Sequence, residues 1–335
     1  MHLQGSLVFI LKKTQGDFMK FKSMLALILA IVMCVLLAAC SKAETSKQKE
    51  ETTTTVVAEN VLVQSAELTE SEKLLFSQDG VFNLLLSGVD NINDIGAADT
   101  IMLMSIDRTR AKIKFTSFAK DTYVSIPNYG ENALGVAYSL GGTSLLVNTI
   151  EHNFGIDIHR FALLNYFTFA DIVDILGPME IELTEKDVEC INSLLKAEGE
   201  SETVSAKSGK IKLNGKQTLA YLRTDGGKGS VDFDFVRTER QRTFLMNVVK
   251  MLSSASADKL LRLAKDTVPY LHTDLTNDEM NALVKGIRIY LLYSQSGLAV
   301  PSADNRECTE TDTGVTFEIK DWGKARTDLK KFIYE

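Results

Sequence analysis

Three separate segments of the sequence carry charged residues of the types that bind phosphate and metal ions. In the first segment, Asp90 follows the apolar run 81–88 and Asp99 precedes the run 100–107. Two carboxylates brought close together repel one another, which raises a pKa or recruits a divalent cation. Oxygen ligands favour Mg²⁺ or Mn²⁺, especially when phosphate completes the coordination shell. Taken alone, this pair is more typical of ordinary strand ends, because aspartate is common in turns.

The second segment lies where another strand-like run, residues 112–118, is expected to reach solvent. Lys120, Asp121 and Thr122 follow it and place a cation, an anion and a hydroxyl side by side. In isolation, the simpler interpretation is an exposed strand end with an internal ion pair.

The third segment is rich in arginine. Arg223 ends one helical pattern, and Arg237, Arg240 and Gln241 follow at the spacing i, i+3 and i+4. That spacing places the last three on one helix face. Arginines clustered near the start of a helix suit phosphate, because the planar guanidinium forms paired hydrogen bonds. The alternative is a basic helix face that is simply solvated.

Together, the three segments indicate a pyrophosphate site, with carboxylates for a metal and arginines for phosphate. A serine protease arrangement is not supported, since no G-x-S-x-G motif is present and His152 and His159 have no nucleophile nearby in the sequence. The four histidines also lack the spacing to cysteine that a zinc site requires.

The elements that must position these residues alternate along the chain. Gly, Pro and turn residues separate apolar runs of strand length from segments with helical spacing. Expected strands are 81–88, 100–107, 112–118, 160–166, 179–183 and 315–319, with the second and third forming a hairpin. Expected helices are 67–79, 144–154 with Thr143 as N-cap, 168–176, 215–222, 237–253, 258–293 with a break at Pro269, and 325–332; residues 185–210 are expected to be a surface excursion. This order predicts an α/β or α+β domain with a central mixed sheet flanked by helices.

The N-terminus predicts an exported protein. Residues 24–39 are sixteen uncharged, mostly apolar residues preceded by four lysines, as in a secretory signal. Their end, Leu37-Ala38-Ala39-Cys40, resembles the bacterial lipobox, which implies acylation of Cys40. The alternative is an uncleaved signal anchor, although sixteen residues are short for a full span. Both interpretations place the rest of the chain on the extracellular face of the cytoplasmic membrane.

The remaining sequence predicts a tether and one folded domain. Residues 1–40 are the signal or anchor, residues 41–66 are a polar tether without aromatics, and residues 67–335 form the domain. The formal net charge of −7 argues against a nucleic-acid partner. Once Cys40 is acylated, only Cys190 and Cys308 remain inside the domain, so no disulfide framework is expected.

Seven stretches carry a resemblance to a known family. They are FNLLLSGVD, ADTIMLMSID, KDTYVSIPNYG, AYSLGG, DIVDILGPMEIEL, LNGKQTLAYLR and DFVRTERQRTFL, and the match is spread over residues 81 to about 252. In this order they resemble the LytR-CpsA-Psr family of cell-envelope proteins. The resemblance implies a central sheet with a hydrophobic pocket that holds a polyprenyl chain. It also implies transfer of a glycan phosphate, of teichoic acid or capsule type, from polyprenyl pyrophosphate to peptidoglycan with a divalent cation.

The resemblance assigns roles residue by residue. It gives Asp90 and Asp99 to the metal, Asp121, Arg223 and Arg237 to catalysis, and Lys120, Arg240 and Gln241 to substrate binding; Asp234 matches the aspartate before the last arginine group. The chain departs from the family pattern at Ala97, Lys120, Gly135, Asp225 and Val236, where the family prefers Arg, Arg, Asn, Arg and Gly.

These departures weaken the phosphate site. Lys120 keeps the charge of arginine but lacks the planar guanidinium that donates two parallel hydrogen bonds. Ala97 and Asp225 remove two cations. Loss of one donor to a developing charge costs about 10²–10³ in rate. The chain could use Lys216, Lys228 or Arg242 in their place. A weakly hydrolytic or purely binding protein of the same fold therefore stands as the alternative to the transferase.

The lipid pocket has candidates, but the pattern alone favours a simpler assignment. The candidates are Leu145, Leu146, Val147, Ile150, Phe161, Leu163 and Phe167. At these spacings such residues are more often ordinary core.

Overall fold

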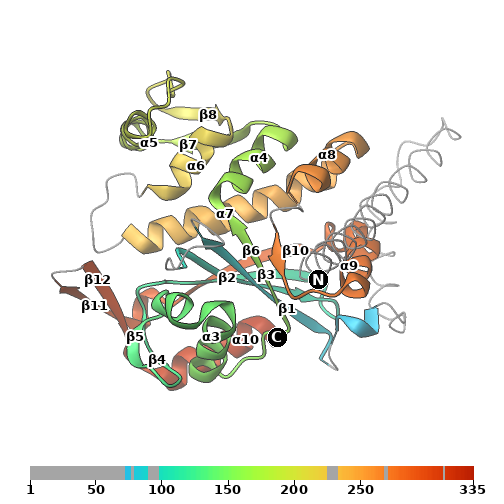
Figure 1. Ribbon diagram of the computed structural model, residues 1–335, viewed down its shortest axis with the longest axis vertical. Coiled ribbons are helices and arrows are strands. Elements are labelled where there is room, and N and C mark those ends of the chain that lie inside the picture. The colour runs from blue at the N-terminus through green and yellow to red at the C-terminus, as the bar shows by residue number, and fades with distance from the viewer. Residues whose placement is uncertain (1–71, 77–78, 90–97, 225–232, 268–270, 312–313) are drawn as a thin grey trace, which may run out of the picture.

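A six-stranded mixed sheet forms the centre of the molecule (Figure 1). The computed structural model describes residues 72–76, 79–89, 98–224, 233–267, 271–311 and 314–335. The strand order is β10-β3-β2-β1-β6-β9. The strands are β1 (Val81–Val89), β2 (Thr100–Asp107), β3 (Lys112–Phe118), β6 (Arg160–Asn165), β9 (His272–Thr273) and β10 (Ser294–Val300).

The strand directions bring several chain ends to one end of the sheet. β1 and β3 are each antiparallel to β2, whereas β6 is parallel to β1 and β10 is parallel to β3. The carboxyl ends of β1, β3, β6 and β10 therefore lie together with the start of β2. We call this the site end of the sheet. The expected hairpin of residues 100–107 and 112–118 is confirmed, as is the mixed sheet.

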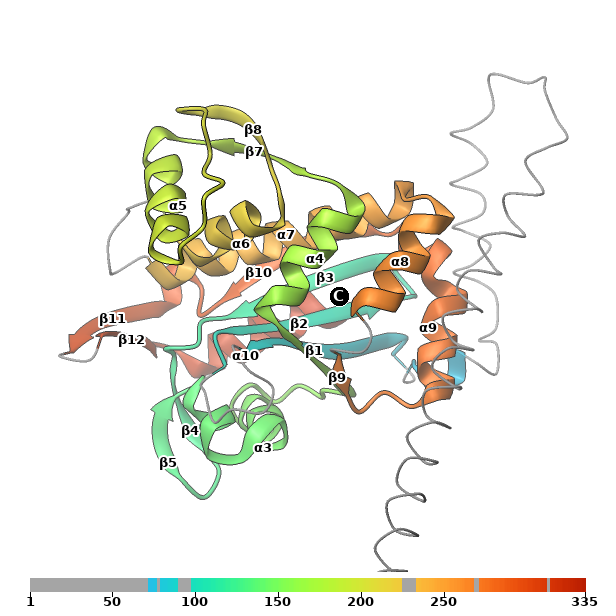
Figure 2. The same cartoon turned by 45° about the horizontal axis from the view of Figure 1, so that its top comes forward.

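Both faces of the sheet are covered, as Figures 1 and 2 show. Along β1, Val81 and Leu85 point into one core cluster, while Phe82 and Leu84 point into another, as the two-residue period of a strand requires. The first cluster packs against α3 (Val136–Phe154) and α10 (Trp322–Tyr334), and the second against α7 (Phe233–Ser254) and α9 (Asn277–Tyr290).

A further layer covers the outer side of α7. It consists of α4 (Tyr166–Leu176), α6 (Gly215–Arg223) and α8 (Ala257–Thr267), with β7 (Met179–Leu183), β8 (Gly209–Leu213) and α5 (Glu185–Ala197) outermost. The expected surface excursion over 185–210 is therefore wrong. Val188, Ile191 and Leu195 bury one face of α5, and Thr184 with Asp187 forms a capping box at its start.

Other differences involve short or interrupted elements. Helix α3 begins at Val136 rather than 144 and is broken at Gly141 and Gly142, where Gly142 has φ 65°. Residues 258–293 form α8, β9 and α9 instead of one broken helix, and among the described residues of 67–79 only the short 3₁₀ turn η1 (Glu72–Leu74) is helical. The strands β4 (Tyr123–Ile126), β5 (Gly130–Ala133), β10 and β11 (Arg306–Thr311) were not expected, whereas β12 (Gly314–Ile319) and α10 were.

A buried ion pair ties the last helix to the sheet. The Nζ of Lys114 on β3 donates to Asp107 Oδ2 at 2.9 Å and to the carbonyl oxygen of Ile333 on α10 at 2.7 Å. Burial lowers the pKa of Lys114, although Asp107 opposes that effect. The C-terminal segment is thus anchored to the central strands.

The predicted export segment lies outside the described residues. In the part of the chain that the structure describes, no helix is both long and apolar enough to cross a bilayer. No disulfide joins Cys190 and Cys308.

Candidate active site

Backbone hydrogen bonds hold three segments together at the site end of the sheet. The Asp99 nitrogen donates to the Gly88 carbonyl at 3.2 Å, the Ala98 nitrogen to the Gly135 carbonyl at 3.4 Å, and the Gly135 nitrogen to the Lys120 carbonyl at 2.8 Å. A Cβ added at Gly135 would lie 3.0 Å from the Ala98 oxygen and 3.3 Å from the Lys120 Cβ. Glycine therefore allows the close approach that places Asp99 and Lys120 in one site.

The start of α7 completes this cluster. Arg237 Nη2 donates to Asp234 Oδ1 at 2.7 Å and to the backbone oxygen of Asp99 at 3.1 Å. The Arg237 and Asp234 side chains are only 11% and 5% exposed. The Arg237–Asp234 ion pair and the hydrogen bond to Asp99 therefore hold the first turns of α7 against the residue that precedes β2.

The second segment also affects the pKa of Asp234. Burial raises the pKa of Asp234, Arg237 opposes that shift, Asp121 adds to it, and Lys120 opposes it. Lys120 Nζ lies 2.9 Å from Asp121 Oδ1. The fold thus brings together five residues that belong to three separate segments of the sequence: Asp99, Lys120, Asp121, Asp234 and Arg237.

The sequence assigned no catalytic or binding role to Asp234. Its Oδ2 is buried and has no hydrogen-bond partner among the described residues. The available signal was its position in the first turn of a helix, three residues before Arg237. That spacing places the two side chains next to each other.

The predicted metal pair is only half described. Asp90 lies outside the described residues, whereas Asp99 is half-buried and its backbone oxygen accepts a hydrogen bond from Arg237. In the described part of the chain, no group of three or more His, Cys, Asp or Glu side chains could hold a metal ion. The nearby donors, Asp99, Asp121 and the unsatisfied Oδ2 of Asp234, are all carboxylate oxygens. Carboxylate oxygen is the donor type that suits Mg²⁺ or Mn²⁺ rather than zinc, but the described carboxylates do not form a complete site, and the metal pair stays a prediction.

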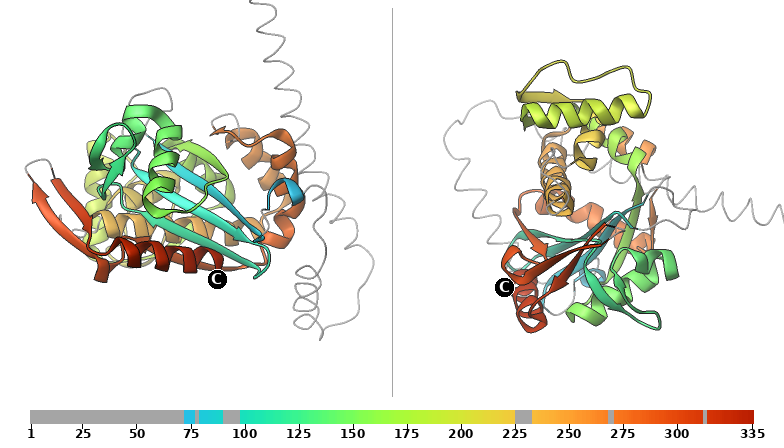
Figure 3. Two further views of the ribbon diagram at one scale, coloured as in Figure 1. Left: turned by 90° about the horizontal axis from the view of Figure 1, so that it is seen from below. Right: turned by 90° about the vertical axis from the view of Figure 1, so that its left-hand side faces the viewer.

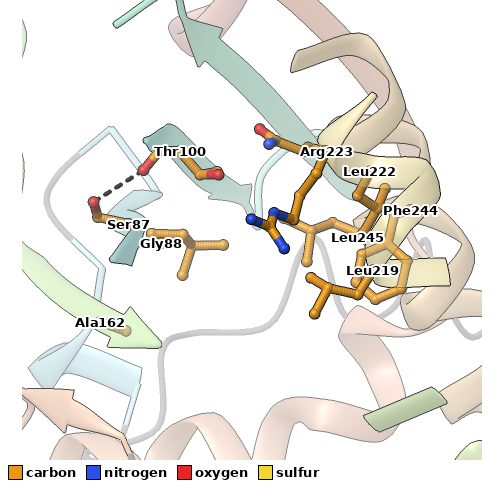
Figure 4. A pocket seen from close by; sticks show the side chains of 11 residues that line it. Ser87, Gly88, Thr100, Ala162, Leu219, Leu222, Arg223, Phe244 and Leu245 are labelled. Atoms are coloured by element: carbon orange, nitrogen blue, oxygen red, sulfur yellow. Dashed lines mark hydrogen bonds between the residues drawn. The ribbon is translucent and has the colours of Figure 1, made fainter. Parts of the chain in front are cut away.

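An apolar pocket lies beside this cluster, between the sheet and helices α6 and α7 (Figure 4). The space between its lining atoms is about 530 Å³, part of which is open solvent. The apolar wall consists of Leu86, Ala162, Leu219, Leu222, Phe244 and Leu245, and the polar part of Ser87, Thr100, Arg223 and Gln241. Because Thr100 directly follows Asp99, the polar part lies next to the charged cluster. This is the arrangement that an apolar tail with an anionic head group would require.

Two predicted phosphate ligands line this pocket. Figure 4 shows the Arg223 guanidinium between the strand residues Ser87, Gly88 and Thr100 and the leucines of α6. Arg223 also pairs with Glu198 at the surface. Gln241 is buried, and its Oε1 has no hydrogen-bond partner among the described residues. An unsatisfied buried amide oxygen in a pocket is a place where a ligand or water can donate.

Arg240 lies on a different side of α7 and is held within the protein. It pairs with Asp187 and donates to the carbonyl oxygens of Thr224 at 2.9 Å and Tyr221 at 3.0 Å. Its guanidinium carbon also lies 4.2 Å from the centre of the Tyr221 ring. The arginine therefore joins α5 and α6 to α7, and its role as a phosphate ligand stays a prediction.

The suggested replacement cations are not gathered at the site. Lys216 pairs with Glu200 on the surface at 2.7 Å, and Lys228 lies outside the described residues. Arg242 lies between α7 and the sheet, where it donates to Ser117 Oγ at 3.1 Å and packs on Gly297.

The lipid candidates named from the sequence lie elsewhere. Leu146, Ile150 and Leu163 are buried in the cluster against α3 and α10, with Leu145, Val147 and Phe161 packed on it. The ordinary-core interpretation is thus confirmed for them, and the side chain of Phe167 is outside the described set. The pocket lies on the opposite face of the sheet. Its lining comes from β1, β6, α6 and α7, whose packing a hydrophobic pattern does not specify.

The Asp187–Arg240 pair predicts a pH-dependent contribution to stability. Burial alone disfavours the Asp187 carboxylate, but hydrogen bonds from Thr184 and the charge of Arg240 outweigh it and lower the pKa of Asp187. Its contribution is present above the unfolded pKa of about 4 and is lost as pH falls through the folded value. We expect Asp187→Asn to cost about 3 kcal/mol of unfolding free energy at pH 7.

Urea unfolding from pH 7 to pH 3 measures this effect. The difference between wild type and Asp187→Asn should shrink below about pH 4. Asp258→Asn, which changes an exposed aspartate on α8, is the control. It should change neither the unfolding free energy at pH 7 nor its dependence on pH. A difference that stays constant down to pH 3 would contradict the assigned ion pair.

Comparison with known proteins identifies the family. The model of the LytR_cpsA_psr family matches residues 33–304. The chain belongs to this family. Among curated relatives, the regulatory protein MsrR of Staphylococcus aureus is 28% identical over 238 residues, which is 70% of this chain and 69% of MsrR. The polyisoprenyl-teichoic acid–peptidoglycan teichoic acid transferase TagU of Enterococcus faecalis is 28% identical over 67% of this chain and 72% of its own.

Solved structures of the family share the fold. TagT of B. subtilis superposes with a TM-score of 0.60 at 20% identity, covering 80% of this chain and 94% of TagT. A structure of TagT with bound octaprenyl pyrophosphate lipid gives 0.59 at 19% identity, covering 81% and 95%. The expected LytR-CpsA-Psr fold, a central mixed sheet flanked by helices, is therefore confirmed.

Proposed function

We propose that this chain is a phosphotransferase that moves a glycan phosphate from a polyprenyl pyrophosphate carrier to peptidoglycan. The observation that carries the proposal is the apolar pocket whose polar part, with Arg223 and Gln241, adjoins Asp99 and Arg237. The name of TagU and the lipid in the TagT structure state a matching activity and ligand for those relatives. The polyprenyl chain would occupy the leucine-lined wall, and the pyrophosphate would reach the charged cluster.

The reaction exchanges one phosphorus–oxygen bond for another. An acceptor hydroxyl oxygen attacks the phosphorus that carries the glycan, and the bond from that phosphorus to the bridging oxygen breaks. Polyprenyl monophosphate leaves with the electron pair. Asp121, with a side chain 30% exposed, is the carboxylate placed to take the hydroxyl proton. Phosphoryl transfer depends mainly on charge stabilisation, which Arg237, Lys120 and Arg223 supply, while buried Asp234 positions Arg237.

The metal and the anchor are parts of the same proposal. A divalent cation bound by Asp90 and Asp99 would neutralise charge on the pyrophosphate. The N-terminal segment, acylated at Cys40, would hold the domain on the extracellular face of the membrane, where a lipid carrier lies.

Release of polyprenyl monophosphate tests the proposal. Full-length protein in detergent is incubated with a polyprenyl-pyrophosphate-linked glycan, uncrosslinked peptidoglycan strands and Mg²⁺, and both polyprenyl monophosphate and the glycan phosphate joined to peptidoglycan are followed by mass spectrometry. We expect metal-dependent release that is lost in Asp99→Ala and kept in Asp258→Ala, which removes an exposed carboxylate from α8. Absence of release from the wild type, or full activity of Asp99→Ala, would contradict the proposed function.

A specific observation favours one alternative, a protein that binds polyprenyl phosphate without turnover. Lys120, Arg223 and Arg240 are each already paired with a carboxylate, so less positive charge is available for the transition state. In that case the lipid would stay bound and no monophosphate would appear. Weak hydrolysis, with water as acceptor, would give monophosphate without a glycan product on peptidoglycan.

Lys120→Arg should increase the rate if the transferase assignment is correct. Arginine offers two parallel hydrogen bonds to phosphate where lysine offers a point charge. One added charge-assisted bond of about 1.4 kcal/mol corresponds to a tenfold rise in kcat/KM. Lys210→Arg on the exposed strand β8 is the matched control and should have no effect. An unchanged or lower rate for Lys120→Arg would show that Lys120 does not contact the reacting phosphate.

A further inference from the structure

A second hollow lies on the surface between the β4–β5 hairpin and the segment formed by β12 and α10, with about 820 Å³ of space that includes open solvent. We call it the groove. Tyr123, Ser125 and Glu131 line one side, and Glu318, Trp322 and Arg326 line the other. Figure 3 shows this C-terminal segment beside α3 and the hairpin, away from the layer that covers α7.

The hairpin side of the groove follows from strand alternation. Val124 and Ile126 are 2% and 1% exposed and enter the core. Tyr123 and Ser125 must then point to the opposite face, where Ser125 pairs in register with Glu131. Tyr123 is 40% exposed. A large aromatic ring and a carboxylate are therefore displayed on one polar face.

The other side of the groove is held in place by packing. The Trp322 ring lies against Phe154, with 5.5 Å between the ring centroids, and Arg326 lies 5.5 Å from the Trp322 centroid. Arg326 Nε also donates to the Asn153 carbonyl at 2.7 Å.

Buried Asn153 joins the two sides. Its Nδ2 donates to the Ser125 oxygen at 2.7 Å, and its Oδ1 accepts from the Ser125 nitrogen at 3.2 Å. The walls are thus linked through one residue, and the groove is preformed.

The groove begins at the proposed catalytic carboxylate. Tyr123 comes two residues after Asp121, which is about 7 Å along a strand. On the opposite side, the Phe317 backbone nitrogen donates to the backbone carbonyl oxygen of Asp121 at 3.0 Å, and Phe317 forms a β-bridge with Thr122. Glu318 is the next residue. Both walls therefore start where Asp121 leaves β3, so a chain lying in the groove would have a segment near the reacting phosphate.

We propose that the groove binds the acceptor, a glycan strand of peptidoglycan. This inference rests on the proposed transferase function and deepens it by assigning the acceptor subsite. Aromatic rings such as Tyr123 and Trp322 pack on the C–H faces of sugars, and carboxylates accept hydrogen bonds from sugar hydroxyl and amide groups. A polar, open hollow accommodates a chain of linked sugars better than a small closed pocket does.

The charges in the groove favour this occupant over an anionic polymer. Glu131 and Glu318 are exposed, and neither takes part in an ion pair among the described residues. Arg326 is the cation on the facing wall, and His152 lies at the edge. Two carboxylates would repel a teichoic-acid-like polyphosphate, whereas uncharged sugar units are accepted without that cost.

The sole tryptophan of the chain reports on the groove directly. The sequence contains one Trp, and it is Trp322 in the groove wall. Full-length protein in detergent is titrated with soluble, uncrosslinked peptidoglycan glycan strands, and the tryptophan emission is followed. We expect a saturable change in emission, and we expect Tyr123→Ala and the double variant Glu131→Gln/Glu318→Gln to weaken the apparent affinity at least tenfold.

Tyr129→Ala is the matched control, because Tyr129 lies in the turn of the same hairpin, is 55% exposed and does not line the groove. It should bind like the wild type. The proposal is overturned if glycan strands leave the emission unchanged, if Tyr123→Ala binds as tightly as Tyr129→Ala, or if a soluble teichoic acid polymer binds instead.

A second assay separates this inference from the proposed function. Hydrolytic release of polyprenyl monophosphate uses water in place of the glycan acceptor, so Tyr123→Ala should keep that release while its transfer to glycan strands falls at least tenfold. Absence of release in the wild type would reject the transferase, and glycan binding could still be present. Equal loss of release and transfer in Tyr123→Ala would reject the groove as an acceptor subsite.

Discussion

Replacing Arg237 with alanine is expected to lower the rate of polyprenyl monophosphate release by about 10²–10³, which is the usual cost of losing one donor to a developing charge. Arg237 links the start of α7 to Asp99 through a hydrogen bond of 3.1 Å and holds Asp234 at 2.7 Å. The variant therefore removes the proposed phosphate ligand and the contact that positions the segment proposed to bind the metal. The rate is measured at saturating lipid, so that a loss of binding is not mistaken for a loss of turnover.

The same change should also lower stability, and a second variant separates the two effects. Without Arg237, a buried carboxylate loses its partner, which costs about 3 kcal/mol. Burial already raises the pKa of Asp234, so this carboxyl would take up a proton. Adding Asp234→Asn removes the unpaired charge and should restore most of the melting temperature without restoring the rate. Arg262→Ala, on the exposed side of α8, is the control for loss of an arginine.

Recovery of activity in the double variant would contradict a catalytic role for Arg237. It would mean that the arginine serves only to neutralise Asp234. Unchanged release in Arg237→Ala alone would place the reacting phosphate elsewhere.

The strongly apolar strands were readable from the sequence because each continuous run is bounded by turn residues. Strands 100–107 and 112–118 have the predicted bounds. The β4–β5 hairpin and strand β11 were missed, because short strands with many polar residues look like loops. Helix α5 was missed although Thr184 and Asp187 formed a capping signal. The polar character of its exposed face concealed the three buried positions.

The charged cluster was predictable in part, whereas the pocket was not. Asp99, Lys120 and Arg237 converge because the strand ends and the start of α7 share one end of the sheet. Arg240, only three residues after Arg237, lies in a different environment. The spacing places Arg237 and Arg240 on one helix face, but it does not show which residues of other elements each of them contacts. The pocket depends on how α6 and α7 lie across the sheet, so residues as distant in sequence as Leu86 and Leu245 form one wall.

Leu219→Trp is expected to reduce turnover of a long polyprenyl pyrophosphate at least tenfold, mainly through a higher KM. Leu219 lies on α6 and faces the pocket from the side opposite the strands (Figure 4). An indole there occupies space that the polyprenyl chain would use. Each buried methylene contributes about 0.8 kcal/mol, so displacing two of them from the pocket already exceeds tenfold.

Chain length makes this prediction specific to the pocket. A two-isoprene pyrophosphate extends only a short way from the charged cluster, so its KM should change little in Leu219→Trp. Leu292→Trp, at a leucine 54% exposed and outside the pocket, controls for the added indole and should behave as wild type with both substrates. If Leu219→Trp affected the short and long pyrophosphates equally, the variant would have disturbed Arg223 or the fold. If it affected neither, the lipid chain would lie outside this pocket, and the charged cluster would have to receive its phosphate from another direction.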